Sequence, residues 1–103
     1  MKILIAGSGQ VGRSLVRQLS AEGYDLTVID NQPQVLERMV EQYDVMAVHG
    51  NCASMETLRA AGVSDADLLI TATGSDELNL LCSMTAHGMN PKIHTIARIR
   101  NPE

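Results

Sequence analysis

The sequence lacks tryptophan and phenylalanine, and Tyr24 and Tyr43 are its only aromatic residues apart from histidine. The core must therefore be built from Val, Ile, Leu, Ala and Met, a mixture typical of a sheet that is buried on both faces. There are only two cysteines, Cys52 and Cys82, and they have neither metal-ligand spacing nor a disulfide framework. This cysteine usage is typical of a reducing cytoplasm, where we expect the protein to reside.

Three further features are missing, and each excludes a class of protein. No run of about 18 apolar residues is present, so we expect no membrane-spanning segment and no direct membrane insertion. The formal net charge is −4, which argues against non-specific nucleic-acid binding. His49, His87 and His94 show no convergent spacing, so we expect no metal site.

Apolar runs alternate along the chain with longer segments of helical period. The runs typical of strands are residues 2–6, 25–30, 44–49, 67–71 and 93–98. A βαβαβαβαβ order implies parallel strands and right-handed crossovers. The sequence therefore predicts an α/β fold, a Rossmann-like doubly wound parallel sheet of five strands in the order 3-2-1-4-5 within a three-layer sandwich.

Local signals predict where the helices begin and end. The first helix ends at Gly23, and the second begins with Asn31 as its cap and Pro33 in its first turn. Its expected buried residues are Val35, Leu36, Met39 and Val40. The third helix is short and ends at Gly62, and the fourth runs from Ser75 to Gly88.

The 103 residues fit one domain, a Rossmann-type nucleotide-binding domain over residues 1–103. Shortly after the fifth predicted strand, Pro102 resembles the opening of a further helix that the sequence does not contain. We therefore expect a fragment, or the front part of a longer polypeptide, truncated after strand five.

A G-x-G-x-x-G pattern follows the first predicted strand and precedes the first helix. It consists of Gly7, Ser8, Gly9, Gln10, Val11 and Gly12. Gly7 permits the tight turn, Gly9 lets a pyrophosphate approach the backbone, and Gly12 lets the helix pack closely on the strand. Free N–H groups of the first helical turn then bind phosphate. The alternative is a glycine turn that binds nothing.

Asp30 ends the second predicted strand, roughly 20 residues after the glycine turn, where an acidic residue hydrogen-bonds ribose hydroxyls. Its neighbour Asn31 is a further candidate for contact with the nucleotide. The carboxylate would repel a 2′-phosphate by about 4 kcal/mol per unit charge at about 4 Å, which disfavours NADP as the ligand. The alternative role of Asp30 is that of a helix-capping carboxylate before Pro33.

Two more turns follow predicted strands, and ligands of open α/β sheets bind beyond the carboxyl ends of the strands. The candidates are Asn51 and Cys52 after strand three, and Ala72, Thr73 and Gly74 after strand four. We expect an adenine ring and linking phosphates there, although such turns also serve as simple connections. A redox-reporting role for Cys52 is disfavoured, because no neighbouring base is evident to lower its thiol pKa.

Arg98 ends the fifth predicted strand, and Arg100 lies on the same side by strand alternation. A guanidinium there could reach a phosphate through paired hydrogen bonds. The alternative is a solvated surface arginine.

The residues needed for hydride-transfer catalysis are not evident. Neither tyrosine has a lysine four positions later, and we expect no second domain to hold a substrate within these 103 residues. Binding without catalysis is the simpler interpretation, so we predict that the chain is not an enzyme. The alternative is the cofactor-binding domain of an NAD-dependent oxidoreductase, separated from its catalytic domain. A methyltransferase is a weaker candidate, because adenosylmethionine has no pyrophosphate.

Several stretches resemble the N-terminal nucleotide-binding domain of Trk-type potassium-uptake regulators, also called the RCK or KTN domain. They are MKILIAGSGQVG at 1–12, VID at 28–30, AAGVSDAD at 60–67, TGSDELN at 73–79 and IARIRNP at 96–102. The resemblance implies that NAD(H) or ATP and ADP bind at Gly7, Gly9, Gly12 and Asp30, with Arg98 on the phosphates. It also implies a homo-oligomer, a dimer or a ring, on the cytoplasmic side of a membrane potassium channel or transporter, whose ion flow is gated by conformational change.

Overall fold

The computed structural model describes residues 1–99 as five strands, four α-helices and one short 3₁₀ helix. The strands are β1 (Lys2–Ala6), β2 (Asp25–Asp30), β3 (Met46–His49), β4 (Leu68–Thr71) and β5 (His94–Ala97). The helices are α1 (Gln10–Ala21), α2 (Pro33–Gln42), α3 (Met55–Ala60), η1 (Val63–Asp65) and α4 (Asp76–Met89). Strands and helices alternate as the sequence predicts.

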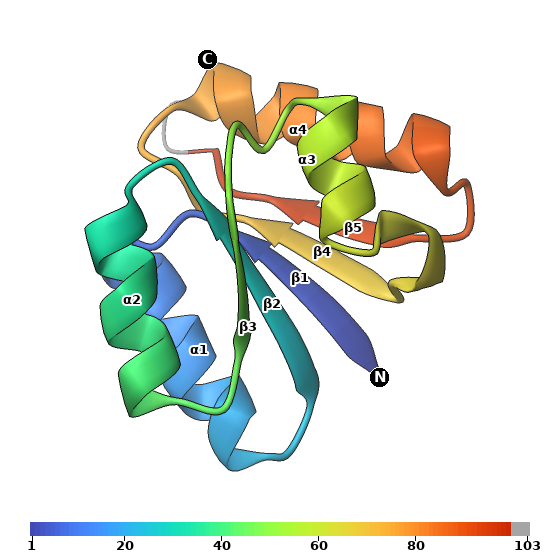
Figure 1. Cartoon of the computed structure of the whole chain (residues 1–103). Coiled ribbons are helices and arrows are strands. Elements are labelled where there is room, and N and C mark those ends of the chain that lie inside the picture. The colour runs from blue at the N-terminus through green and yellow to red at the C-terminus, as the bar shows by residue number, and fades with distance from the viewer. Residues whose placement is uncertain (100–103) are drawn as a thin grey trace.

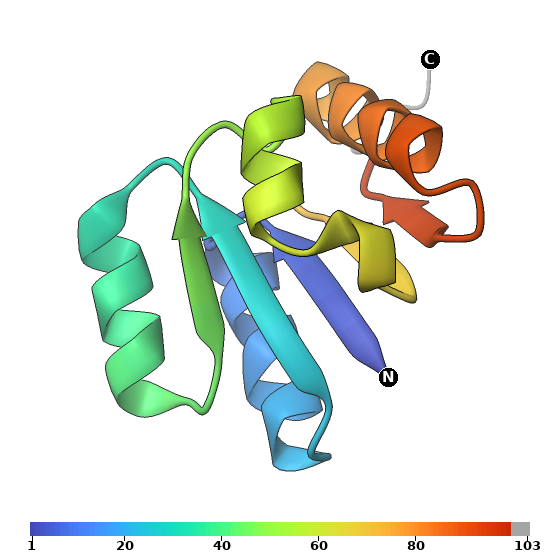
Figure 2. The same ribbon diagram turned by 45° about the vertical axis from the view of Figure 1, so that its right-hand side comes forward.

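All neighbouring strands are parallel, and the sheet has the order β3-β2-β1-β4-β5. This confirms the predicted Rossmann-like topology. Helices α1 and α2 cover one face of the sheet, and α3 and α4 cover the other (Figures 1 and 2). The strand order reverses at β1, which pairs with β2 on one side and with β4 on the other. In such sheets the crevice for a ligand opens at this reversal, beyond the carboxyl ends of the strands.

Two aliphatic clusters fill the spaces between the sheet and the helices. Alternate residues of β1 point to opposite faces, so Ile3 and Ile5 pack toward Val16 of α1, whereas Leu4 and Ala6 pack toward Leu58 of α3. All six are at most 1% exposed. The central strand is therefore buried on both faces, as its continuous apolar run predicts.

The structure corrects several local predictions. Residue Gln32, not Asn31, occupies the N-cap position of α2, and no side chain caps that helix. Val40 is 49% exposed and does not belong to the buried face of α2. Three strands are shorter than predicted: β3 begins at Met46, β4 begins at Leu68, and β5 covers only His94–Ala97. Helix α4 extends one residue beyond Gly88, to Met89.

Within residues 1–99 no helix combines the length and apolar character needed to cross a bilayer. Arg100 and Pro102 lie outside the described residues, so the predicted role of Arg100 and the expected further helix stay predictions.

Candidate functional site

A crevice of about 560 Å³ opens at the carboxyl ends of β1 to β4. Its walls are the segments that follow four different strands, and this volume is within the range of pockets that hold small ligands. The lining residues are Gly7, Ser8, Gly9, Ile29, Asp30, Asn31, Gln32, Val35, Gly50, Asn51, Cys52, Ala72, Thr73, Gly74, Ser75 and Leu78. Asp30 is the only charged side chain among these described residues.

The three glycines of the turn between β1 and α1 have different structural roles. Gly7 has φ +107°, and a Cβ there would lie 2.7 Å from the carbonyl oxygen of Ala72. A Cβ on Gly12 would lie only 2.1 Å from the carbonyl oxygen of Gly7. A Cβ on Gly9 would meet nothing within 4 Å. Gly7 and Gly12 are therefore required for packing, whereas Gly9, which lines the crevice, has open space where its Cβ would lie.

Helix α1 presents an uncapped N-terminus beside this space. No side chain accepts a hydrogen bond from its first turn, and that turn contains no acidic residue. By contrast, Ser54 caps α3 and Ser75 caps α4 through their hydroxyl oxygens. The first amides of a helix lack intrahelical partners and lie at the positive end of its dipole. The arrangement at α1 suits a phosphate group, which accepts hydrogen bonds and carries negative charge.

Asp30 joins the glycine turn to the start of α2. Its Oδ2 accepts hydrogen bonds from the Ser8 backbone N–H at 2.8 Å and from the Ser8 hydroxyl at 2.5 Å. Its Oδ1 accepts from the Gln32 backbone N–H at 2.9 Å. A carboxylate has about four lone-pair positions, so these three bonds leave capacity for one ligand hydroxyl. The carboxylate therefore positions the turn and also lines the crevice.

Cys52 lines the crevice after β3, and its environment differs from the one that the sequence suggested. The pKa of Cys52 is lowered, chiefly because the Cys82 thiol donates a hydrogen bond to its sulfur. Burial and the charge of Asp30 act in the opposite direction. The group responsible is not a neighbouring base but a second thiol, which lies thirty residues away in the sequence and which the sequence analysis did not connect with Cys52.

A buried amide fixes the wall of the crevice after β4. Asn79 is 0% exposed, and its Oδ1 accepts hydrogen bonds from the Thr73 N–H at 2.9 Å and the Thr73 hydroxyl at 2.6 Å. Its Nδ2 donates to the carbonyl oxygens of Arg98, at 2.8 Å, and Thr73, at 3.3 Å. All the hydrogen-bonding capacity of this amide is thus used to hold the turn and the chain after β5 together.

Replacing Asn79 with leucine should therefore destabilise the domain strongly, because it leaves the Thr73 amide and the Arg98 carbonyl without their partner. We expect a loss of about 2–4 kcal/mol in the free energy of unfolding, measured by urea denaturation. The exposed amide of Gln18 provides the control, since Gln18→Ala should change stability by less than about 0.5 kcal/mol. Equal stability of the two variants would contradict the role assigned to Asn79.

The crevice brings together most of the residues that the sequence nominated. Those that line it are Gly7, Ser8, Gly9, Asp30, Asn31, Asn51, Cys52, Ala72, Thr73 and Gly74. Four nominated residues lie elsewhere. Gln10 and Val11 begin α1, Gly12 packs against Gly7, and half-buried Arg98 follows β5, one strand beyond the crevice wall.

Sequence reasoning missed the remaining lining residues, which are Ile29, Gln32, Val35, Gly50, Ser75 and Leu78. Val35 and Leu78 lie in the first turns of α2 and α4, and both are partly buried. A helix that starts at the carboxyl end of a strand places its first apolar residue near the crevice, and this signal could have identified them.

A second hollow, at the amino ends of the strands, includes Asp65, Asp67 and His94. It lacks a glycine turn and an open helix N-terminus, so it offers no comparable phosphate site. Within the described part of the chain, no three His, Cys, Asp or Glu side chains come together as a metal-binding group.

Comparison with protein families matches residues 3–103 to the TrkA-N domain model. The chain belongs to the TrkA-N domain family. It is 41% identical over 103 residues to the Trk system potassium uptake protein TrkA of Haemophilus influenzae. The alignment covers 100% of this chain and 22% of that protein, so the chain spans about a fifth of its relative.

Two similar solved structures are named with a bound nucleotide. The C-terminal domain of Kef from Shewanella denitrificans, in an AMP-bound form, has a TM-score of 0.86 and 31% identity, covering 98% of this chain and 60% of that one. The GsuK channel bound to NAD has a TM-score of 0.85 and 25% identity, covering 98% of this chain and 18% of that one.

Proposed function

We propose that this TrkA-N domain is a regulatory module of a potassium uptake system, which binds an adenine nucleotide in the crevice at the carboxyl ends of the strands. The single observation that carries the proposal is the uncapped N-terminus of α1 beside Gly9, directly adjacent to the carboxylate of Asp30. Together these groups match the two most polar parts of such a ligand, its phosphates and its ribose.

The phosphates would lie over Gly9, where the α1 amides supply the hydrogen bonds. No lysine or arginine is among the described residues that line the crevice, so backbone groups carry this interaction. Arg98, the predicted phosphate ligand, follows β5 and would need a side-chain reorientation to reach the crevice. The ribose would donate a hydroxyl hydrogen bond to the remaining lone pair of Asp30.

The adenine ring would lie between the turn at Asn51 and the turn at Thr73, with Val35 and Leu78 as apolar lining. This arrangement suits NAD(H), AMP, ADP and ATP, which share an adenosine. It disfavours NADP, because the 2′-phosphate would face Asp30 without a compensating cation among the described lining residues.

Binding without catalysis is supported by the same lining. Asp30 is engaged by three protein hydrogen bonds, and the other ionisable group among the described lining residues is the Cys52 thiol, which interacts with Cys82. Among the described lining residues, no group is placed as a proton donor or acceptor for a substrate. A regulatory role is further supported by the relatives, one named as a potassium uptake protein and another as a channel bound to NAD.

Regulation requires that the nucleotide favour one of two states of the assembly. We propose that the partner is a membrane-embedded potassium transporter or channel, that the domain works on its cytoplasmic side, and that several copies assemble as a dimer or a ring. Nucleotide binding would then shift the conformation of the assembly and thereby gate ion flow.

Calorimetric titration of the purified domain with AMP, ADP, ATP, NAD, NADH and NADP tests the proposal. We expect saturable binding of adenosine nucleotides, and an affinity for NADP at least about tenfold below that for NAD because of the charge on Asp30. Failure of every adenine nucleotide to bind at millimolar concentration would overturn the proposal.

Gly9→Ala is the matched variant for this titration. Its Cβ would enter the open space that a phosphate needs, so affinity should fall while the fold is retained. Gly88→Ala, in the last turn of α4 and also surrounded by open space, should leave affinity unchanged.

A further inference from the structure

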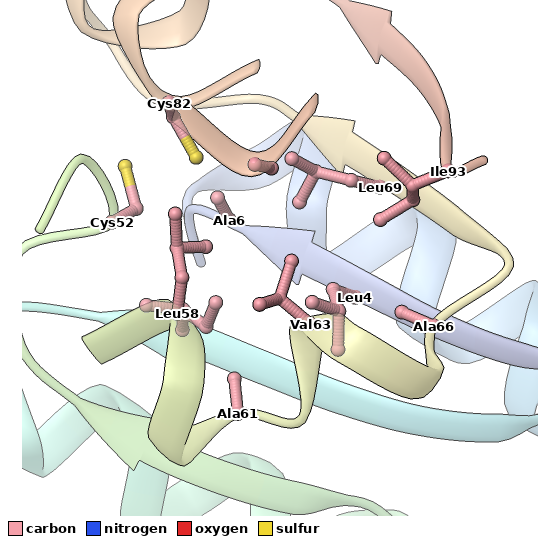
Figure 3. Close-up of a cluster of buried hydrophobic side chains, with 12 residues drawn as sticks. Leu4, Ala6, Cys52, Leu58, Ala61, Val63, Ala66, Leu69, Cys82 and Ile93 are labelled. Atoms are coloured by element: carbon pink, nitrogen blue, oxygen red, sulfur yellow. The ribbon is translucent and has the colours of Figure 1, made fainter. Parts of the chain in front are cut away.

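The two cysteines of the chain, thirty positions apart in sequence, meet at one end of the cluster between the sheet and the helices α3 and α4. Cys52 lies in the turn between β3 and α3, and Cys82 lies in the middle of α4. Figure 3 shows the sulfur atom of Cys52 next to the sulfur atom of Cys82. They are 4% and 0% exposed, and both are free thiols.

The hydrogen bond between the thiols makes the two groups chemically unequal. It lowers the pKa of Cys52, and the same bond together with burial raises the pKa of Cys82 far above its ordinary range. The thiolate is the reactive form of cysteine, so this direction of the pKa shifts, together with the opening of Cys52 onto the crevice, favours Cys52 as the attacking group and Cys82 as the partner that resolves the intermediate.

Access to the pair also differs between the two residues. Cys52 lines the nucleotide crevice, whereas Cys82 does not. A small oxidant that enters the crevice would thus reach Cys52 first, with Cys82 immediately behind it.

We propose that Cys52 and Cys82 form an internal disulfide when a hydroperoxide enters the crevice, and that this disulfide weakens nucleotide binding. Disulfide formation does not depend on the identity of the ligand, whereas its effect on nucleotide binding rests on the proposed function.

The reaction proceeds in two steps and consumes one peroxide. The Cys52 thiolate attacks one oxygen of hydrogen peroxide, the O–O bond breaks, and the departing hydroxide takes up a proton to become water. The Cys82 sulfur then attacks the resulting sulfenic acid, forming the S–S bond and expelling the second oxygen as water with the Cys82 proton. Two thiols lose two electrons to the peroxide, and two waters leave.

The two cysteines lie in segments that form walls of the crevice, so a disulfide between them affects the crevice. A disulfide requires sulfurs about 2 Å apart, closer than two thiols in contact, so we expect bond formation to draw the turn at Cys52 and helix α4 toward each other. Both segments are crevice walls, because Asn51 and Cys52 line it from one side and Ser75 and Leu78 from the other. Narrowing the adenine end should lower nucleotide affinity about fivefold or more, and bound nucleotide should slow the oxidation reciprocally.

The first test uses the intact domain treated with hydrogen peroxide and then analysed by mass spectrometry and thiol counting. We expect the monomer to lose the mass of two hydrogen atoms and both free thiols, reversibly with dithiothreitol. In Cys82→Ser, whose hydroxyl can still donate to Cys52, we expect a Cys52 sulfenic acid, trapped by dimedone, and no disulfide. If Cys82 keeps a free thiol while Cys52 is oxidised in the protein without substitutions, the proposed disulfide is wrong.

The second test is calorimetric titration of the reduced and the oxidised domain with NAD and AMP. Weaker binding after oxidation, restored by reduction and absent in Cys82→Ser, supports the coupling. If the disulfide forms and nucleotide affinity does not change, the proposed coupling between the two is wrong, whereas the proposal that the disulfide forms is supported. If the reduced domain binds no nucleotide while the disulfide still forms, the proposed nucleotide-binding function is wrong. The proposed disulfide is still supported in that case.

Discussion

Gly12→Ala is expected to unfold the domain or to bring it close to unfolding. Its Cβ would lie 2.1 Å from the Gly7 carbonyl oxygen and 2.9 Å from the Gly7 carbonyl carbon, and both are backbone atoms that no side-chain rotation can remove. Relief requires α1 to move away from β1, which opens the cluster around Val16. We expect the free energy of unfolding to fall by about 3 kcal/mol or more, measured by urea denaturation.

The same substitution at Gly88 is the control for Gly12→Ala. Gly88 lies in the last turn of α4, and a Cβ there meets nothing within 4 Å. Alanine loses less conformational freedom than glycine on entering a helix, so stability should be retained or should rise by about 0.5–1 kcal/mol. A Gly12→Ala domain as stable as the Gly88→Ala domain would show that α1 does not need its close approach to Gly7.

Asp30→Ala should produce the largest loss of nucleotide affinity among single changes that keep the fold. The change removes the acceptor for the ribose and also releases the Ser8 amide and the Gln32 amide. A hydrogen bond to a charged group contributes about 1.5–3 kcal/mol, so affinity for AMP or NAD should fall roughly ten- to hundredfold in a calorimetric titration.

Two comparisons make the Asp30 result specific. Asp25, the first residue of the same strand, is exposed at the opposite end of the sheet, so Asp25→Ala should leave affinity unchanged. Removing Asp30 also removes the charge that repels a 2′-phosphate, and the preference for NAD over NADP should therefore shrink. An Asp30→Ala domain with unchanged affinity and unchanged preference would mean that the ribose does not contact this carboxylate.

The strand order and the principal polar site could be predicted because their signals are local. Apolar runs alternate with amphipathic segments, and right-handed parallel crossovers allow few arrangements of such a chain. The glycine pattern follows β1 directly, and Asp30 ends β2, so the carboxyl ends of these strands bring the two together. The bond between Ser8 and Asp30 is the physical result of that placement.

Other features depend on contacts between distant parts of the chain. The hydrogen bond of Asn79 to the Arg98 carbonyl and the approach of Cys82 to Cys52 have no local pattern in the sequence. Val40 continues the apolar period of α2, yet it is exposed because no element among residues 1–99 covers it. Periodicity predicts which face is apolar, but it does not predict how far the neighbouring elements extend over that face.

The crevice has one further consequence, because its walls come from four separate crossovers between Gly7 and Leu78. A nucleotide that contacts all of them would find no binding surface on an unfolded chain, so its binding energy adds to the stability of the native state. At a ligand concentration about 100 times the dissociation constant this contribution reaches about 2.7 kcal/mol. Cellular nucleotide levels would thereby influence how long the domain survives proteolysis.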